Sequence, residues 1–452
     1  MARKAPEPTP VPTPAPRAAR AVRRCAAALA ALVVTGLAAA PSASAAPAAI
    51  SGAGSRVLAA GEASPSRAPE LPEGLFGDAD PKYDGVWRQS YALLAEHTAG
   101  RRPAASAVDW LLGQQCADGS FPAYRAEPAK ACGKAAPGDT NMTAAAVQAL
   151  AALGDHDGAV QHGVRWLRAH QNKDGGFGAA AGGPTDANTV SVVLGALVAA
   201  GQDPAKVTAG GHTPYQALAA LQVGCKAAAA DRGAFAYQAK DGELAPNASA
   251  STAAVLAAEG RGLTVPAAKK GTDEPVHAPS CTDEDEPAGK ADGGRAAASR
   301  AADAGAAYLV RTLAAHGQRM PGLTPKADPG NTAAAVLALA AGGHTTAARK
   351  PLPRLEHDGV AWARTAGPAA WAQLVLAAHA VGADPHHFGG QDLVKQLDAT
   401  GPASTAPHAS ASPAAKSSGG GGVNVWWIIG VGLAVGAGIG FLISGRNKGP
   451  RL

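Results

Sequence analysis

The chain has 452 residues, a formal net charge of +5 and five cysteines, and 4% of its residues are aromatic. The basic residues do not gather along one stripe, which argues against nucleic-acid binding. Alanine and glycine are abundant, so we expect helices that pack closely through small side chains.

Residues 1–45 are predicted to be a secretory signal peptide. A proline-rich segment with several arginines precedes an apolar run from Cys25 to Ala40, and Ala43-Ser44-Ala45 offers a small-residue cleavage site. An uncleaved signal anchor is the alternative. Residues 46–81 are rich in Ala, Pro, Ser and Gly, so we predict a disordered stalk there.

The clearest structural unit lies between Gly163 and Pro204. Gln171, Gly175 and Phe177 form a glycine turn with an aromatic plug, and Asp186 then opens a helix. Apolar residues in this helix recur with helical spacing and line one face. Gly201 is expected to end the helix.

The same unit recurs along residues 82–399. Gln115, Gly119 and Phe121 repeat the first turn motif with the same internal spacing, and weaker copies follow further down the chain. Such self-similarity predicts stacked helical units that bury their apolar faces against one another. Trp110, Trp166 and Trp371 are expected in the core.

Residues 265–300 interrupt this pattern. They hold the acidic run Asp283–Glu286 and almost no apolar side chain, so we predict a disordered, solvated insert. An acidic metal site is the alternative, but the spacing of a calcium-binding loop is missing.

The C-terminal part has the composition of a membrane anchor. Residues 400–422 are predicted to be a flexible linker. Residues 423–444 carry no charge and are long enough to cross a bilayer as a single transmembrane helix. The basic tail, residues 445–452, is expected in the cytoplasm, which places the repeat domain on the outer side of the cell membrane.

Four cysteines remain once the signal peptide is removed: Cys116, Cys132, Cys225 and Cys281. An even number outside the cytoplasm suggests disulfides, and three pairings exist. We favour Cys116 with Cys132 and Cys225 with Cys281, because this arrangement closes the shortest loops.

The two Gln-x3-Gly-x-Phe motifs, which begin at Gln115 and Gln171, resemble the prenyltransferase and squalene-cyclase repeat, here with Phe where that family often has Trp. The resemblance implies an all-α fold, an α/α toroid built as a six-pair helical barrel. It would place the Trp-bearing helices outside and the Ala-rich helices after Asp139, Asp186 and Asp328 inside.

The catalytic motifs of that family are missing. The sequence lacks the Asp-x-Asp-Asp acid of the cyclases, the Asp-Asp-x-x-Asp magnesium motif and a zinc-ligand set. We therefore expect no catalytic residue, no metal and no cofactor, and an enzyme is disfavoured. The layout is also similar to the extracellular cobalamin carriers, toroids that bind a ligand and do not catalyse.

Six polar residues precede or begin the predicted inner helices and are the candidates for a ligand-binding rim. They are Asp139, Asn141, Asp186, Asn188, Asp328 and Asn331. The simpler interpretation is helix N-capping, in which a side-chain oxygen accepts from free backbone N–H groups. On one rim of a toroid the same groups could also contact a ligand.

The sequence thus favours a surface-anchored binding protein for a small apolar ligand, cobalamin-like or isoprenoid-like, or for a partner protein. A membrane transporter and a separate lid protein are the expected partners, beside the lipid bilayer itself. A divergent isoprenoid or terpenoid enzyme and a structural cell-wall protein are the alternatives. If the protein were purely structural, we would expect its inner helices to pack against one another without a cavity.

Overall fold

The computed structural model describes residues 72–134, 136–269, 271–278, 281, 294–322 and 326–406. All of them belong to one compact unit, Ala68–Leu452. The predicted signal peptide (1–45), transmembrane helix (423–444) and tail (445–452) lie outside the described residues. Within the described ranges, no helix has the length and apolar character needed to cross a membrane.

Helices are the dominant regular structure of the described part of the chain, and strands are few and short, which confirms the all-α prediction. The strands form two short antiparallel pairs, β1 (Ala239–Lys240) with β2 (Glu243–Leu244) and β3 (Met320–Pro321) with β4 (Ala327–Asp328). The helices are α1 (Gly85–Thr98), α2 (Ala105–Gly113), α3 (Thr140–Leu153), α4 (Asp157–Ala169), α5 (Ala187–Ala199), α6 (Pro214–Ala219), α7 (Ala248–Ala258), α8 (Arg295–Ala315), α9 (Pro329–Ala341), α10 (Thr345–Arg349), α11 (Leu352–Arg354), α12 (Val360–Ala366), α13 (Pro368–Ala380) and α14 (Leu393–Asp398).

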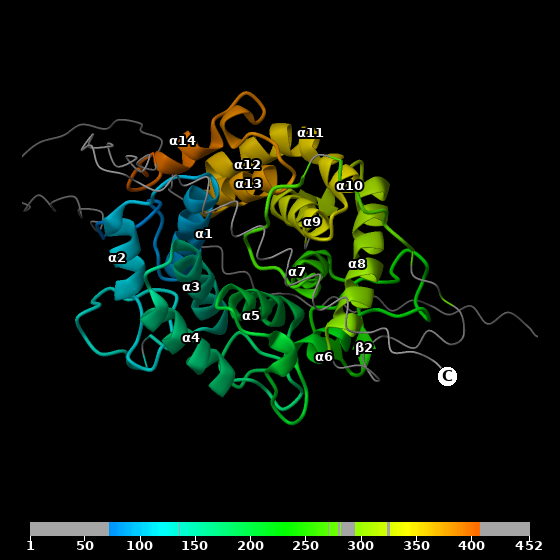
Figure 1. Cartoon of the computed structure of the whole chain (residues 1–452), viewed down its shortest axis with the longest axis horizontal. Helices are drawn as coiled ribbons and strands as arrows, with labels where there is room; N and C mark the ends of the chain where they lie inside the picture. The colour runs from blue at the N-terminus through cyan, green and yellow to red at the C-terminus, as the bar shows by residue number, and fades with distance from the viewer. Residues whose placement is uncertain are drawn as a thin grey trace, which may run out of the picture. The chain divides into compact units, whose positions relative to one another are not determined.

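Six of these helices contact one another in a closed cycle. Helix α1 contacts α3, and the contacts continue through α5, α7, α9 and α13 back to α1. We call these six the inner helices. The others pack outside this cycle, for example α2 on α1, α4 on α3 and α8 on α7 (Figure 1).

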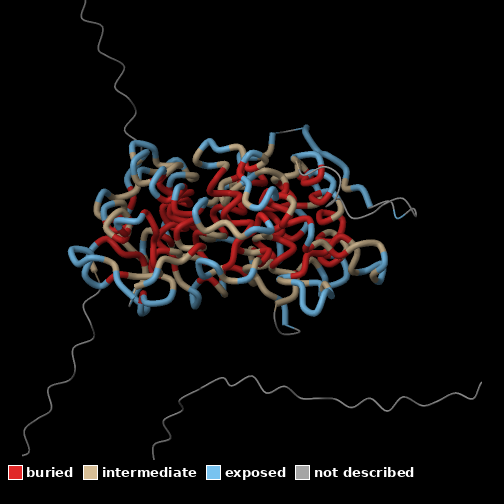
Figure 2. The backbone as a smooth tube through the Cα atoms, turned by 90° about the horizontal axis from the view of Figure 1, so that it is seen from below, coloured by how far each residue is buried: buried red, intermediate tan, exposed pale blue. Residues whose placement is uncertain are grey.

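The composition of each helix matches its place. Helix α5 is buried along nearly its whole length, from Ala187 to Leu197, and its residues are small or aliphatic. Helix α4 instead buries one stripe, which includes Val164, Trp166 and Leu167, and exposes its polar face. A helix that is apolar on all sides must be enclosed by others, whereas an amphipathic helix covers them from outside. Figure 2 shows the buried backbone in the middle of the domain and the exposed loops along its edges.

The predicted glycine turns are confirmed. Phe121 and Phe177 are 0% and 1% exposed, as expected for aromatic plugs. The Nε2 of Gln115 donates to the Gly119 carbonyl at 3.1 Å, and the Nε2 of Gln171 donates to the Gly175 carbonyl at 2.8 Å. Gly119 and Gly175 have φ values of +94° and +85°, a backbone conformation that glycine adopts without strain.

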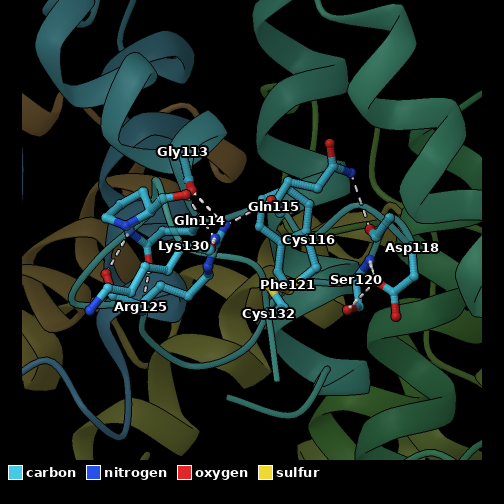
Figure 3. The surroundings of a disulfide bond; sticks show 12 residues. Gly113, Gln114, Gln115, Cys116, Asp118, Ser120, Phe121, Arg125, Lys130 and Cys132 are labelled. Carbon is cyan, nitrogen blue, oxygen red and sulfur yellow. Dashed lines mark hydrogen bonds between the residues drawn. A yellow bond between two sulfur atoms is a disulfide. The ribbon is translucent and has the colours of Figure 1, made fainter. Parts of the chain in front are cut away.

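Both predicted disulfides are present, with Cα–Cα distances of 5.7 Å for Cys116–Cys132 and 5.6 Å for Cys225–Cys281. The first closes a loop that is organised around a buried arginine (Figure 3). The guanidinium of Arg125 donates to four backbone carbonyls, those of Gly113, Gln115, Pro128 and Lys130. Its positive charge is therefore solvated by the loop itself.

The fold extends beyond both predicted boundaries, so the stalk (46–81) and linker (400–422) predictions were wrong at their inner ends. Phe76 is fully buried and its N–H donates to Gln89 at 2.9 Å. The backbone of Gly401 lies against the Phe76 ring, where no Cβ would fit. Arg102 pairs with Thr405 through two backbone hydrogen bonds, which join the two ends of the described chain.

The insert prediction for residues 265–300 was also wrong at both ends. Val265 is 4% exposed, and the Ala268 N–H donates to the Ala380 carbonyl at 3.0 Å. At the other end α8 begins at Arg295 and buries Ala297. The segment around Ala268 contains few large apolar residues, which is why the sequence suggested disorder. Its backbone is held instead by a hydrogen bond to the end of α13. The acidic run 283–286 lies outside the described residues.

Trp110, Trp166 and Trp371 are buried core residues, as predicted. The expectation that tryptophan marks the outer helices holds for Trp110 on α2 and Trp166 on α4. It was wrong for Trp371, which lies on the inner helix α13.

Candidate functional site

The inner helices surround a cavity of about 380 Å³. Its lining comes from all six inner helices, from α12 and from the segment that follows α7. The lining residues are Trp87, Tyr91, Asn141, Gln148, Asn188, Ser191, Val192, Ser249, Thr252, Ala253, Leu256, Arg261, Gly262, Leu263, Asp328, Gly330, Asn331, Ala333, Ala334, Leu337, Trp362, Gln373 and Leu376. This volume lies within the range of small-molecule sites.

The polar lining begins at the N-terminal ends of the inner helices, which we call the mouth of the cavity. Asn141, Asn188 and Ser249 each occupy the second position of α3, α5 and α7. Asn331 occupies the third position of α9, where its Nδ2 donates to the Pro321 carbonyl at 2.9 Å. Residues near the starts of four inner helices therefore face one shared space.

The predicted rim candidates divide into two groups. Asn141, Asn188, Asp328 and Asn331 line the cavity, whereas Asp139 and Asp186 do not.

Asp139 and Asp186 instead cap helices. Asp139 Oδ1 accepts from the Met142 N–H at 2.9 Å, and Asp186 Oδ1 accepts from the Thr189 N–H at 2.8 Å. The second oxygen of Asp186 accepts from the Thr189 hydroxyl at 2.8 Å. Burial raises the pKa of both carboxyl groups, and these hydrogen bonds act in the opposite direction.

Asp328 has both roles, since it lines the cavity and its Oδ1 accepts from the Asn331 N–H at 2.9 Å. Among the described residues, Asp328 and Arg261 are the charged side chains of the lining. Arg261 follows α7 and therefore lies toward the opposite end of the cavity, about 16 Å along the helix axis.

One side of the mouth is aromatic, a feature that the sequence analysis missed. Trp87 and Tyr91 on α1 have ring centroids 5.0 Å apart and tilted by 38°. Trp362 on α12 and Gln373 on α13 continue this side. Burial raises the pKa of Tyr91 to about 12, which keeps its hydroxyl protonated, and Gln373 is its hydrogen-bonding partner. The sequence did carry a signal for this aromatic side, because Trp87 and Tyr91 are one helical turn apart and so lie on the same face of a helix.

The deeper lining is mainly aliphatic, with Gln148 and Arg261 at its far end. Val192, Leu256, Leu337 and Leu376 come from four different inner helices and lie beyond the polar mouth. A ligand in this cavity would therefore have an apolar part in contact with these side chains and a polar part near the mouth.

A segment of chain forms the floor of the cavity. We call residues 260–268 the strap, because they run from the end of α7 to the end of α13. Gln148 holds the strap, since its Oε1 accepts from the Leu263 N–H at 2.7 Å and its Nε2 donates to the Val192 carbonyl at 3.1 Å. A second cavity of about 520 Å³ shares Gln148, Arg261 and Gly262 with the first, so the strap lies between the two spaces.

The site offers neutral hydrogen-bonding groups, aromatic rings and one carboxylate at its mouth. Within the described ranges, no group of three or more His, Cys, Asp or Glu residues is arranged to hold a metal ion.

No protein-family model matches the chain, and no curated protein matches it. One solved structure, described as the crystal structure of a protein from Actinoplanes, is similar over 66% of this chain and 77% of that chain. The two share 17% sequence identity, and the TM-score is 0.39.

Proposed function

We propose that this protein is a membrane-anchored, cell-surface binding protein that holds a small, largely apolar molecule in its central cavity and does not transform it. The observation that carries this proposal is the cavity of about 380 Å³, with polar groups at its mouth and aliphatic side chains in its depth. A purely structural protein would have its inner helices packed shut, so the cavity counts against that alternative.

We further propose that the helical domain is an α/α toroid of the prenyltransferase and squalene-cyclase kind. The closed cycle of contacts among α1, α3, α5, α7, α9 and α13, each with a covering outer helix, supports this arrangement. The repeated glycine turns with buried Phe121 and Phe177 support the family resemblance.

Binding without catalysis is supported by the state of the polar groups. The carboxylate at the mouth, Asp328, uses Oδ1 to cap α9, and the remaining polar groups near it are amides and hydroxyls. Such groups orient a ligand, but they do not transfer protons readily near neutral pH.

A location outside the cell is supported by the two disulfides, which persist in oxidising compartments. The predicted signal peptide (1–45) and transmembrane helix (423–444) complete this proposal from the sequence. The protein would then present its ligand to a membrane transporter, with a separate lid protein covering the mouth.

Native mass spectrometry of the released ectodomain, residues 46–410, tests the proposed function. This fragment contains the whole described core and the Arg102–Thr405 pairing that closes it. We expect a co-purifying small molecule that disappears when Ala334→Phe fills the cavity. The proposal would be contradicted if the native protein were ligand-free and the Ala334→Phe variant bound every tested small molecule as well as the native protein does.

A further inference from the structure

We propose that the cavity takes an organic cation, a molecule with a quaternary or protonated ammonium head and an apolar remainder. This inference rests on the proposed function, because it names the ligand class for the same cavity. It is carried by the placement of three aromatic rings and one carboxylate on the same side of the mouth.

The first observation is the close approach of polar and aromatic groups to Gly330, the second residue of α9. A methyl group on its Cα would be crowded, at 3.2 Å from Asp328 Oδ1, 3.4 Å from Gln373 Oε1 and 3.3 Å from Trp362 Cζ2. Two oxygen atoms and an indole ring thus converge beside the Gly330 backbone. The methyl groups of a quaternary ammonium ion carry part of its positive charge, so these neighbours favour them over the methyl groups of a neutral molecule.

The second observation is the continuity of the aromatic side. Tyr91 neighbours Trp87 at a ring-centroid distance of 5.0 Å and interacts with Gln373 through its hydroxyl. Their helices, α1 and α13, are adjacent in the inner cycle, and α13 in turn contacts α9. Gln373 therefore neighbours Tyr91 on one side and, beside Gly330, Asp328 and Trp362 on the other. Several rings around one cation are the arrangement that recognises quaternary ammonium groups.

The third observation is the charge at the mouth. Within the described part of the chain, no lysine or arginine lies within ion-pair distance of Asp328, and Arg261 belongs to the strap at the far end. The positive end of α9 is equivalent to about half a charge, so it offsets only part of the carboxylate. An anionic head would face this negative charge unpaired, whereas a cationic head would neutralise it.

A matched pair of probes tests the ligand class. Choline and its uncharged carbon isostere, 3,3-dimethyl-1-butanol, have nearly the same shape and differ in charge. We would titrate both into the full-length chain in an uncharged maltoside detergent and follow binding by calorimetry and by ligand-observed NMR. We expect choline to bind about tenfold more tightly. Equal affinities would overturn the inference.

Variants with a matched control locate the effect. Asp328→Asn keeps a helix cap, because asparagine caps as well as aspartate, and it should weaken choline binding about tenfold without changing the isostere. Asp186→Asn makes the same change in a cap that does not line the cavity, and it should leave both affinities unchanged. Equal losses in the two variants would overturn the assignment of Asp328.

Two further variants alter the space itself. Gly330→Ala adds a methyl group that crowds Asp328, Trp362 and Gln373 and so narrows the cavity beside the ligand head. Trp362→Leu removes an indole while keeping an apolar side chain. Each should reduce choline affinity about tenfold. Unchanged affinity in both would overturn the proposed position of the head.

These outcomes separate the two proposals. Equal binding of both probes, or a neutral molecule in the native mass spectrum, would remove the cation assignment and leave the binding function intact. A ligand-free native protein that binds neither probe would remove both.

Discussion

The two ends of the inner helices differ although the same six helices form both. At their N-terminal ends Asn141, Asn188 and Ser249 face an accessible cavity. At their C-terminal ends the strap crosses the ring, with its own Val265 buried and Gln148 holding it in place. One end is thus suited to a ligand, and the other is closed by the chain itself.

The difference follows from how helix ends are satisfied. In four of the six inner helices, α3, α5, α7 and α9, a side chain of the preceding residue caps the first N–H groups, so no further chain is needed there. The last carbonyls of a helix need donors from elsewhere. The Ala380 carbonyl accepts from Ala268 of the strap, and the Val381 carbonyl accepts from the Arg349 guanidinium. Donor segments therefore close this end.

The largest expected effect concerns Glu96, which is fully buried near the C-terminal end of α1. Burial, with the neighbouring Asp398 carboxyl, raises the pKa of Glu96 from 4.5 to about 9. Between these values the folded protein keeps a proton that the unfolded chain releases. The free energy of unfolding should therefore fall as pH rises, by up to about 1.4 kcal/mol per pH unit.

Glu96→Gln should remove this slope and make the variant more stable than the native protein at pH 8. Urea denaturation at pH 5, 7 and 8.5 measures the free energy of unfolding of both proteins. Glu127→Gln, a substitution of an exposed glutamate, is the control. Parallel pH profiles for native protein and Glu96→Gln would show that Glu96 does not titrate in this range.

The next effect lies on the mouth side, in the loop that leads to α3. Replacing Cys116 and Cys132 together by serine should lower the free energy of unfolding by about 3 kcal/mol, as expected for a cross-link across a loop near this length. The loop after α4 has the same glycine turn without a disulfide, and there Asp174 accepts from Gly176 and Thr185. Asp174→Ala should cost only about 1 kcal/mol. Similar losses in the two loops, measured by thermal denaturation, would contradict this ranking.

A third prediction addresses the contact between α5 and the strap. A Cβ on Gly195 would lie 2.8 Å from Gly262 Cα and 2.9 Å from Gln148 Oε1. Gly195→Ala should therefore destabilise the protein by about 1–3 kcal/mol through overpacking. Gly158→Ala on α4 has no atom within 4 Å of the new methyl group and should stabilise by up to about 1 kcal/mol. If Gly195→Ala and the native protein were equally stable in chemical denaturation, the strap would have moved to accommodate the methyl group without a loss of stability.

The smallest effect separates the capping residues from the cavity residues at the mouth. Asp186→Ala should destabilise by about 1 kcal/mol through the lost cap of α5, and Asp186→Asn should recover most of it. Asn188→Ala should leave stability nearly unchanged and alter the mass of any co-purifying ligand, because the Asn188 side chain lines the cavity. If Asp186→Ala changed the mass of the co-purifying ligand and Asn188→Ala did not, the ligand-facing role would belong to the capping residue Asp186.

Local patterns predicted much of this molecule. Asp139, Asp186 and Asp328 were recognised as helix starts because a cap acts within three residues of itself. Glycine turns and loop lengths similarly predicted the buried Phe121 and the disulfide pairing. Gln148 could not be found in this way, because it gains its role from α5 and the strap, which are distant from it in the sequence.

The sequence by itself determined the helical class, the repeated turns and the polar residues at the helix starts, since each depends on nearest neighbours along the chain. Only the tertiary structure decided which of those polar residues face the cavity, where the domain begins and ends, and how the strap closes one end. Those features depend on contacts such as Phe76 with Gly401 and Gln148 with Leu263, which join distant parts of the chain.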